Sequence, residues 1–284
     1  MRVQEMYLRG KKRLLEAGCE SAAFDAGKLL ELLSGWDRTA QLIHGEEICP
    51  SEWHDRYHAL IERRASGEPL QYLIKKWDFM GHSFFVGPGV LIPREETELL
   101  VREAITFCEK KRCRILDLCA GSGAIAISCA CALPWCSVTA IEWSDSAMRY
   151  LCKNCAAILP CDNRVQRMQA DVLAPATVQS IANIDVMLSN PPYIPTADLS
   201  HLQREVQYEP AMALDGGTDG LDFYRAILQL WYPKLNPGGL LAVECGIGQC
   251  NILADWFEQS GLRNVRVIPD FNGIGRVVRG IRPK

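Results

Sequence analysis

The stretch RILDLCAGSG, residues 114–123, decides the fold, because an apolar run there ends in a turn that holds two glycines. The run 114–118 predicts a short buried strand, and the small residues at 124–130 predict a helix directly after the turn. Glycines between a strand and a helix permit a tight turn and the close approach of a ligand to the backbone. The stretch therefore predicts an α/β fold with a binding site at the end of this strand.

A second strand is predicted at 137–142, and it ends in Glu142. An acidic residue at this place can accept hydrogen bonds from both hydroxyls of a ribose. A nicotinamide site has similar features, and Ala126 stands at the third glycine of that fingerprint, where alanine is permitted. The glycine turn therefore leaves several nucleoside ligands open, and a solvated carboxylate is the alternative interpretation of Glu142.

The turn Asn190-Pro191-Pro192-Tyr193 follows a further apolar strand predicted at 184–189. The side-chain carbonyl of Asn190 and the main-chain carbonyl of Pro191 can accept the two hydrogens of a planar NH2 group. Proline fixes φ at about −65°, so both acceptors are held in place before a substrate arrives. The turn favours methyl transfer to a planar nitrogen over hydride transfer, and an ordinary proline-rich turn is the alternative.

Taken together, the glycine turn, Glu142 and residues 190–193 resemble a class I S-adenosylmethionine-dependent methyltransferase that acts on an exocyclic nitrogen. Three flanking segments are similar to the peptide chain release factor glutamine methyltransferases, namely GEPLQYL (67–73), VLIPREETE (90–98) and EVQYEP (205–210). The resemblance covers nearly the whole chain. It implies methylation of the side-chain amide of the glutamine in the Gly-Gly-Gln loop of class 1 release factors.

The resemblance also implies S-adenosyl-L-methionine as donor, S-adenosyl-L-homocysteine as product, and a set of site residues. The donor-binding residues are Asp117, Cys119, Ala120, Gly121, Ser122, Gly123, Glu142, Asp171, Val172 and Asn190. The catalytic residues are Asn190, Pro191, Pro192 and Tyr193, which also bind substrate together with Arg94 and Thr97.

Within this set, Glu142 is expected on the ribose, Asp171 on the adenine amino group and Val172 on the adenine ring. A solvated carboxylate is the alternative for Asp171, and a proline-broken connector is the alternative for the loop that holds Arg94 and Thr97. The chain departs from the family pattern at Ala120, where threonine is frequent, and at Trp143, which is bulky beside the ribose.

Three parts are expected along the chain. Residues 1–72 predict a helical bundle that recognises the substrate, 73–92 a β-hairpin linker with Gly81 near its turn, and 93–284 the methyltransferase domain. Strands are expected near 114–118, 137–142, 165–169, 184–189, 239–244, 264–268 and 275–281. Alternation with helices predicts a Rossmann-like, mostly parallel seven-stranded sheet, with the last two strands forming an antiparallel hairpin at one edge.

Composition bears on whether the protein is membrane-bound, exported, disulfide-bonded or metal-binding. No apolar run approaches the roughly 20 residues of a membrane span, and no export signal is evident, so a cytoplasmic protein is expected. The 13 cysteines are expected as free thiols in a reducing compartment. No metal site is predicted, because Cys152 with Cys155 and His54 with His58 are isolated pairs.

The charge balance bears on the partner. The net charge is −3, and residues 1–72 carry 10 Lys and Arg against 12 Asp and Glu, a net −2. A protein that relies on phosphate contacts normally presents a basic face. We therefore expect no direct nucleic-acid binding. The sequence does not show the oligomeric state, and a monomer is the default expectation. The second hypothesis is a methyltransferase for an exocyclic amine of adenine or guanine in RNA or DNA, and the third is a donor-binding adaptor without chemistry.

Overall fold

The computed structural model describes residues 1–160 and 164–284, which form two compact units. One unit holds Met1–Lys76 together with the segment Gln203–Tyr208, and the other holds Trp77–Leu202 and Glu209–Lys284. A segment far along the chain therefore belongs to the N-terminal helical unit.

The helical unit is built from amphipathic helices around one apolar core. Its helices are α1 (Val3–Glu16), α2 (Ala22–Ser34), α3 (Arg38–Ile43), α4 (Ser51–Ala65) and α5 (Leu70–Ile74). Their apolar stripes meet in a core that contains Met6, Leu14, Leu29 and Leu30, each fully buried. The helical pattern in the sequence predicts α1, α2 and α4 but not α3 or α5, which are too short to show a full period.

The side chain of Ser21 does not cap the start of α2. Ser21 stands at the N-cap position, but its hydroxyl donates to Asp25 Oδ1 at 2.8 Å and accepts no backbone N–H of the helix. Asp25 in turn accepts from Arg64 Nε at 2.6 Å. Arg64, which is 4% exposed, also donates to Glu205 of the segment 203–208. The buried guanidinium therefore ties that segment to the helices.

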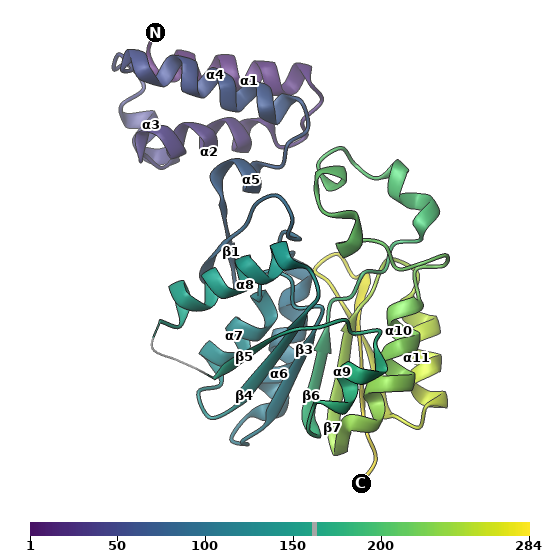
Figure 1. Ribbon diagram of the computed structural model, residues 1–284. Helices are drawn as coiled ribbons and strands as arrows, with labels where there is room; N and C mark the ends of the chain where they lie inside the picture. The colour runs from purple at the N-terminus through teal and green to yellow at the C-terminus, as the bar shows by residue number, and fades with distance from the viewer. Residues whose placement is uncertain (161–163) are drawn as a thin grey trace. The chain divides into compact units, whose positions relative to one another are not determined.

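The second unit contains the predicted seven-stranded sheet (Figure 1). Its strands are β3 (Arg114–Leu118), β4 (Ser137–Glu142), β5 (Val165–Gln169), β6 (Ile184–Ser189), β7 (Leu235–Glu244), β8 (Arg263–Pro269) and β9 (Gly275–Ile281). Their order is β5-β4-β3-β6-β7-β9-β8, parallel except for β9, which pairs antiparallel with β7 and β8. The α/β fold class and the antiparallel hairpin at the edge are confirmed. The two-stranded hairpin of β1 (Lys76–Phe79) and β2 (His82–Phe85) turns at Met80 and Gly81.

Helices cover both faces of the sheet because alternate strand residues point to opposite sides. On β3, Ile115 packs in one core with α6 (Glu98–Cys108), α7 (Ala124–Ala132) and α8 (Asp145–Ile158), and Leu116 packs in the other (Figure 1). The second core includes α9 (Pro175–Gln179), α10 (Asp222–Ala226) and α11 (Cys250–Gln259). Shorter helical turns are η1 (Glu95–Thr97), η2 (Thr196–His201), η3 (Val206–Tyr208), η4 (Ala211–Ala213), η5 (Ile227–Trp231) and η6 (Tyr232–Lys234).

The strand order reverses between β3 and β6, which are direct neighbours. Ser189 at the end of β6 donates its hydroxyl to the carbonyl of Leu118 at the end of β3, at 2.8 Å. Open α/β sheets bind ligands beyond the carboxyl ends of the strands at such a reversal. The fold thus brings the glycine turn and the Asn190 turn together, as the sequence predicts. Among the described helices, none is both long and apolar enough to cross a membrane.

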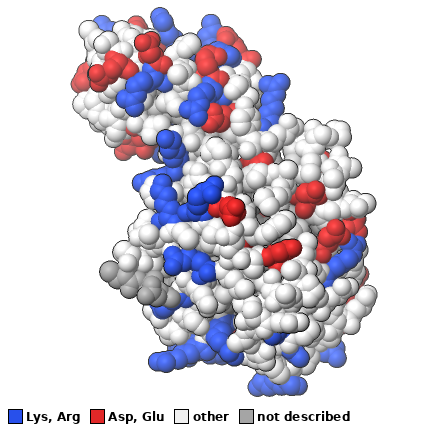
Figure 2. Space-filling view, viewed as in Figure 1, with Lys and Arg blue, Asp and Glu red and all other residues white. Residues whose placement is uncertain are grey.

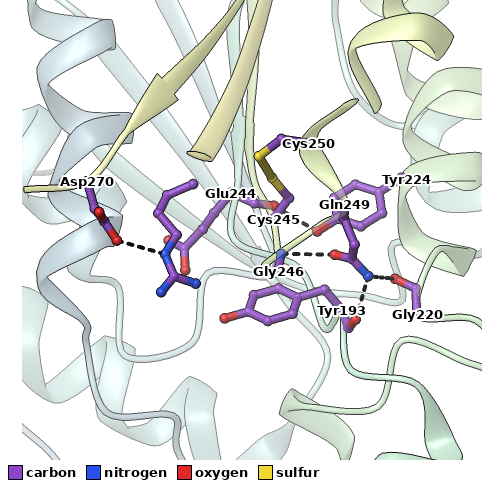
Figure 3. Close-up of a disulfide and its surroundings, with 10 residues drawn as sticks. Tyr193, Gly220, Tyr224, Glu244, Cys245, Gly246, Gln249, Cys250 and Asp270 are labelled. Carbon is purple, nitrogen blue, oxygen red and sulfur yellow. Dashed lines mark hydrogen bonds and ion pairs between the residues drawn. A yellow bond between two sulfur atoms is a disulfide. The ribbon is translucent and has the colours of Figure 1, made fainter. Parts of the chain in front are cut away.

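The cysteines differ from the expectation in one place. Cys245 and Cys250 are joined by a disulfide (Figure 3), whereas the sequence predicts free thiols throughout. The end of β7 and the first turn of α11 bring their Cα atoms to 6.2 Å, a separation that a disulfide can bridge. The other cysteines within the described ranges are free thiols, most of them buried.

Candidate active site

A cavity opens where the carboxyl ends of β3, β4 and β6 meet. Residues of the glycine turn, the end of β4, the segment after β5 and the turn after β6 line it, and it contains about 640 Å³ including its mouth. Of the predicted donor and acceptor residues, those in its lining are Cys119, Gly121, Glu142, Asp171, Val172, Asn190 and Pro192.

The glycine turn has the backbone conformation that makes close approach possible. Cys119, Gly121 and Gly123 have φ values of 61°, 56° and 83°, in the left-handed region that favours glycine. A Cβ on Gly121 would meet no atom within 4 Å, whereas one on Gly123 would lie 2.3 Å from Leu151 Cδ1. Gly121 is therefore open toward a ligand, Gly123 is required by packing, and Cys119 is a strained non-glycine residue at the site.

Asp117 lies beneath the turn and outside the cavity lining. It is fully buried, and its Oδ2 accepts from the backbone N–H of Ala126 at 3.0 Å. Its Oδ1 has no hydrogen-bond partner among the described atoms, and burial raises the pKa of this carboxyl well above its usual value. Asp117 holds the start of α7 in place. Ala120, Ser122 and Gly123 also lie outside the cavity lining. They form the backbone of the turn on either side of Gly121.

Glu142 has the hydrogen-bonding capacity that a ribose requires. Its two carboxylate oxygens accept from the backbone N–H groups of Gly121 and Ser144, each at 2.7 Å. Burial raises the pKa of Glu142, and these amides oppose that shift. A carboxylate offers about four acceptor positions. Acceptor capacity therefore remains for the hydroxyls of a ribose, so the residue fits the nucleoside end of S-adenosylmethionine.

The segment after β5 lines the cavity with Asp171 and Val172. The strand ends at Gln169, so Asp171 lies two residues past it, and its Oδ1 accepts from the N–H of Leu173 at 2.8 Å. Val172 is 3% exposed, and its carbonyl accepts from Trp231 Nε1 at 2.8 Å. Trp143 is 60% exposed and lines the cavity beside Glu142.

Gln249 holds the turn of residues 190–193 in place. Its Nε2 donates to the carbonyl of Tyr193 at 2.9 Å, and its Oε1 accepts from the N–H of Gly246 at 2.9 Å (Figure 3). The backbone of Tyr193 also lies against Gly216, where an added Cβ would come within 2.8 Å of it. Burial raises the pKa of Tyr193 to about 12, so the phenol is neutral near pH 7. Of this turn, Asn190 and Pro192 are in the cavity lining, and Pro191 and Tyr193 are not.

Arg94 and Thr97 are engaged by carboxylates and lie outside the cavity lining. Arg94 is paired with Glu209, whose second oxygen accepts from the N–H of Ile92 at 2.9 Å. Thr97 is 4% exposed, donates to Glu244 Oε2 at 2.6 Å, and accepts from Asn190 Nδ2 at 3.1 Å.

Glu244, Glu209 and Gln249 contact residues of the site and are not among the residues predicted from the sequence. Glu244 ends a predicted strand, as Glu142 does, so its position at the same edge of the sheet was the available indication. Glu209 lies in the EVQYEP segment. No pattern in the sequence indicates a role for Gln249, because only the fold brings the start of α11 to Tyr193.

A group of thiols lies outside this site. The sulfur atoms of Cys108, Cys113 and Cys136, all buried, lie within 4.8 Å of one another. Cys113 and Cys136 precede β3 and β4, so the group lies at the opposite end of these strands from the glycine turn. Three sulfurs are one ligand short of a tetrahedral structural metal site.

The fold and the site define a class I S-adenosylmethionine-dependent methyltransferase. Among solved structures, the chain resembles the catalytic domain of hMettl16 in complex with MAT2A 3'UTR hairpin 6, with a TM-score of 0.58 and 14% identity over 78% of this chain and 81% of that one. This likeness concerns the fold alone.

Sequence comparisons define the family. The family model of the PrmC N-terminal domain matches residues 5–74, and that of conserved hypothetical protein 95 matches residues 100–216. The release factor glutamine methyltransferase of Geobacter sulfurreducens is 40% identical over 94% of this chain and 92% of its own length. That of Moorella thermoacetica is 40% identical over 93% of each. The chain belongs to the release factor glutamine methyltransferase family.

Proposed function

We propose that this protein transfers a methyl group from S-adenosylmethionine to the side-chain amide nitrogen of the glutamine in the Gly-Gly-Gln loop of class 1 peptide chain release factors. The observation that carries the proposal is that Asn190 and the glycine turn line one cavity from the ends of two neighbouring strands. The family membership supports the same substrate.

The donor is held by the turn that contains Gly121, by Glu142, and by Asp171 with Val172. The open face of Gly121 and the N-terminus of α7 suit the amino-acid end of the donor. Glu142 accepts from the ribose hydroxyls, and Val172 packs on the adenine. When bound, S-adenosylmethionine supplies an activated methyl group, whose bond to sulfur breaks with the electron pair left on sulfur as the bond to nitrogen forms.

The acceptor nitrogen is a poor nucleophile because its lone pair is delocalised into the amide carbonyl. Asn190 Oδ1 and the carbonyl of Pro191 accept its two hydrogens and aim the nitrogen at the donor side of the cavity. Tyr193 supports the turn and encloses the glutamine side chain. Positioning of this kind contributes about 7–11 kcal/mol in well-oriented reactions. No general base is required before transfer, since the nitrogen can lose a proton to water afterwards.

The helical bundle of residues 1–72 is assigned to recognition of the release factor, and Arg94 and Thr97 support the acceptor side of the cavity. We assign a monomer that acts in the cytoplasm. Acidic and basic side chains are intermixed on the face of the helical unit drawn in Figure 2. With a net charge of −3, this pattern supports a protein acceptor over an RNA or DNA acceptor.

The proposal is tested by transfer of labelled methyl from S-adenosylmethionine to a purified bacterial release factor. The matched acceptor is the same factor with its loop glutamine changed to alanine. We expect label on the first and not on the second. Equal label on both, or label that appears only with total RNA and disappears after nuclease treatment, would overturn the proposal.

A further inference from the structure

Three polar side chains from distant parts of the sequence form one hydrogen-bonded chain behind the acceptor turn. Asn190 Nδ2 donates to Thr97 Oγ1 at 3.1 Å, and Thr97 Oγ1 donates to Glu244 Oε2 at 2.6 Å. Thr97 and Glu244 are 4% and 2% exposed. They come from the turn before α6 and from the end of β7. These two hydrogen bonds therefore connect the cavity to a buried carboxylate.

The chemistry of the three groups decides which of them donates and which accepts in each hydrogen bond. An asparagine amide can present either its oxygen or its NH2 group, and a hydroxyl can both donate and accept. An ionised carboxylate only accepts. When Glu244 is ionised, Thr97 must therefore donate to it, which leaves the Thr97 oxygen to accept from Asn190. The amide of Asn190 is thereby fixed with Nδ2 toward the protein and Oδ1 toward the cavity.

We propose that Thr97 and Glu244 are positioning residues of the methyl transfer, which orient Asn190 so that its oxygen accepts an N–H of the substrate amide. This inference rests on the proposed function, because an NH2 acceptor is what gives the orientation its use. With the amide reversed, Asn190 would present NH2 to NH2, and the acceptor would lose one of its two contacts.

The surroundings of Glu244 are consistent with this role. The cationic side chains of Arg94 and Arg276 interact electrostatically with the Glu244 carboxylate. So do the carboxylate of Glu96 and the phenol of Tyr193. Arg94 is already paired with Glu209, and Arg276 donates to Asp270 at 3.1 Å. The hydroxyl of Tyr224 donates to the main-chain carbonyl of Glu244 at 2.8 Å and fixes the end of the strand (Figure 3). The carboxylate of Glu244 is thus available to accept the hydrogen bond from Thr97.

The first test compares Thr97→Val, which keeps the shape and removes the hydroxyl, with Thr97→Ser, which keeps the hydroxyl. Single-turnover transfer at saturating donor should fall about 10- to 100-fold in Thr97→Val and stay within about threefold of wild type in Thr97→Ser. Donor affinity by calorimetry should stay within about twofold in both. Equal losses in the two variants would show a role in packing only, and an unchanged rate in Thr97→Val would overturn the proposal.

The second test does not depend on transfer. Exchange of the Asn190 side-chain amide protons, followed by nuclear magnetic resonance, should be slow in wild type and Thr97→Ser and at least about tenfold faster in Thr97→Val. Glu244→Gln, whose amide can also donate, should speed this exchange and serves if Thr97→Val fails to fold. Equal exchange rates in wild type and a folded variant would overturn the positioning role. Failure of the proposed function appears separately, as wild-type protein that leaves the release factor unlabelled.

Discussion

The donor half and the acceptor half of this cavity are built in different ways. In the proposed function, the donor half is a main-chain turn at 119–123 with Glu142 close to it in sequence, joined by Asp171 and Val172 after β5. The acceptor half depends on a chain of side chains, Asn190, Thr97 and Glu244, drawn from three separate elements. A backbone site tolerates side-chain changes around it, whereas a side-chain network fails when one member is lost. Substitutions should therefore separate the two halves.

The largest effect is expected for Asn190→Ala. It removes an acceptor that holds the reacting nitrogen, so single-turnover transfer should fall by about 10³-fold or more. The matched control is Asn251→Ala on the exposed surface of α11, which should transfer at the wild-type rate. A loss of less than about tenfold in Asn190→Ala would exclude the clamp.

The next effect belongs to the donor half. Glu142→Gln keeps the size of the side chain but removes the charge that strengthens hydrogen bonds from ribose hydroxyls, so the donor Kd should rise about 10- to 100-fold. Transfer at saturating donor should fall much less. Calorimetry with S-adenosylhomocysteine provides the measurement, and an unchanged Kd would place Glu142 outside the donor site.

These two residues also show what the sequence could predict. Gly121 comes just after one predicted strand and Glu142 ends the next, so local pattern was sufficient to predict that both lie at the cavity. Asp117, predicted with them, lies beneath the turn and outside the lining. The partner of Asn190 was not predictable, because Thr97 and Glu244 meet only through the packing of η1 against the end of β7. The helices α3 and α5 were missed for the related reason that five or six residues do not complete a periodic pattern.

Stability should respond to Glu244 in the opposite direction to activity. Burial raises the pKa of Glu244 from 4.5 to about 7. Because the folded-state pKa is raised, the contribution of this group to the free energy of unfolding is fully present below about pH 4.5. That contribution is lost as pH rises through about 7. Glu244→Gln should therefore raise the free energy of unfolding at pH 8 by about 1–3 kcal/mol, with a smaller gain at pH 5. Urea unfolding at both pH values tests this, and a variant that is less stable at pH 8 would contradict it.

The smallest effect is a pH dependence of the acceptor half. Above about pH 7 the carboxylate of Glu244 only accepts, and below it the neutral acid can also donate to Thr97. Single-turnover transfer at saturating donor should therefore rise about three- to tenfold between pH 6 and pH 8. The rise should be absent in Glu244→Gln. The same rise in the variant would assign the titration to another group.

The separation of the two halves is tested most directly by measuring donor Kd for Glu142→Gln and Asn190→Ala side by side. We predict a donor Kd raised about 10- to 100-fold in Glu142→Gln and within about twofold of wild type in Asn190→Ala, although the latter has lost transfer. Comparable loss of donor affinity in both variants would contradict the account. Asn190 would then chiefly have the donor-binding role that the family resemblance also implies for it, and its loss of transfer would need no acceptor clamp.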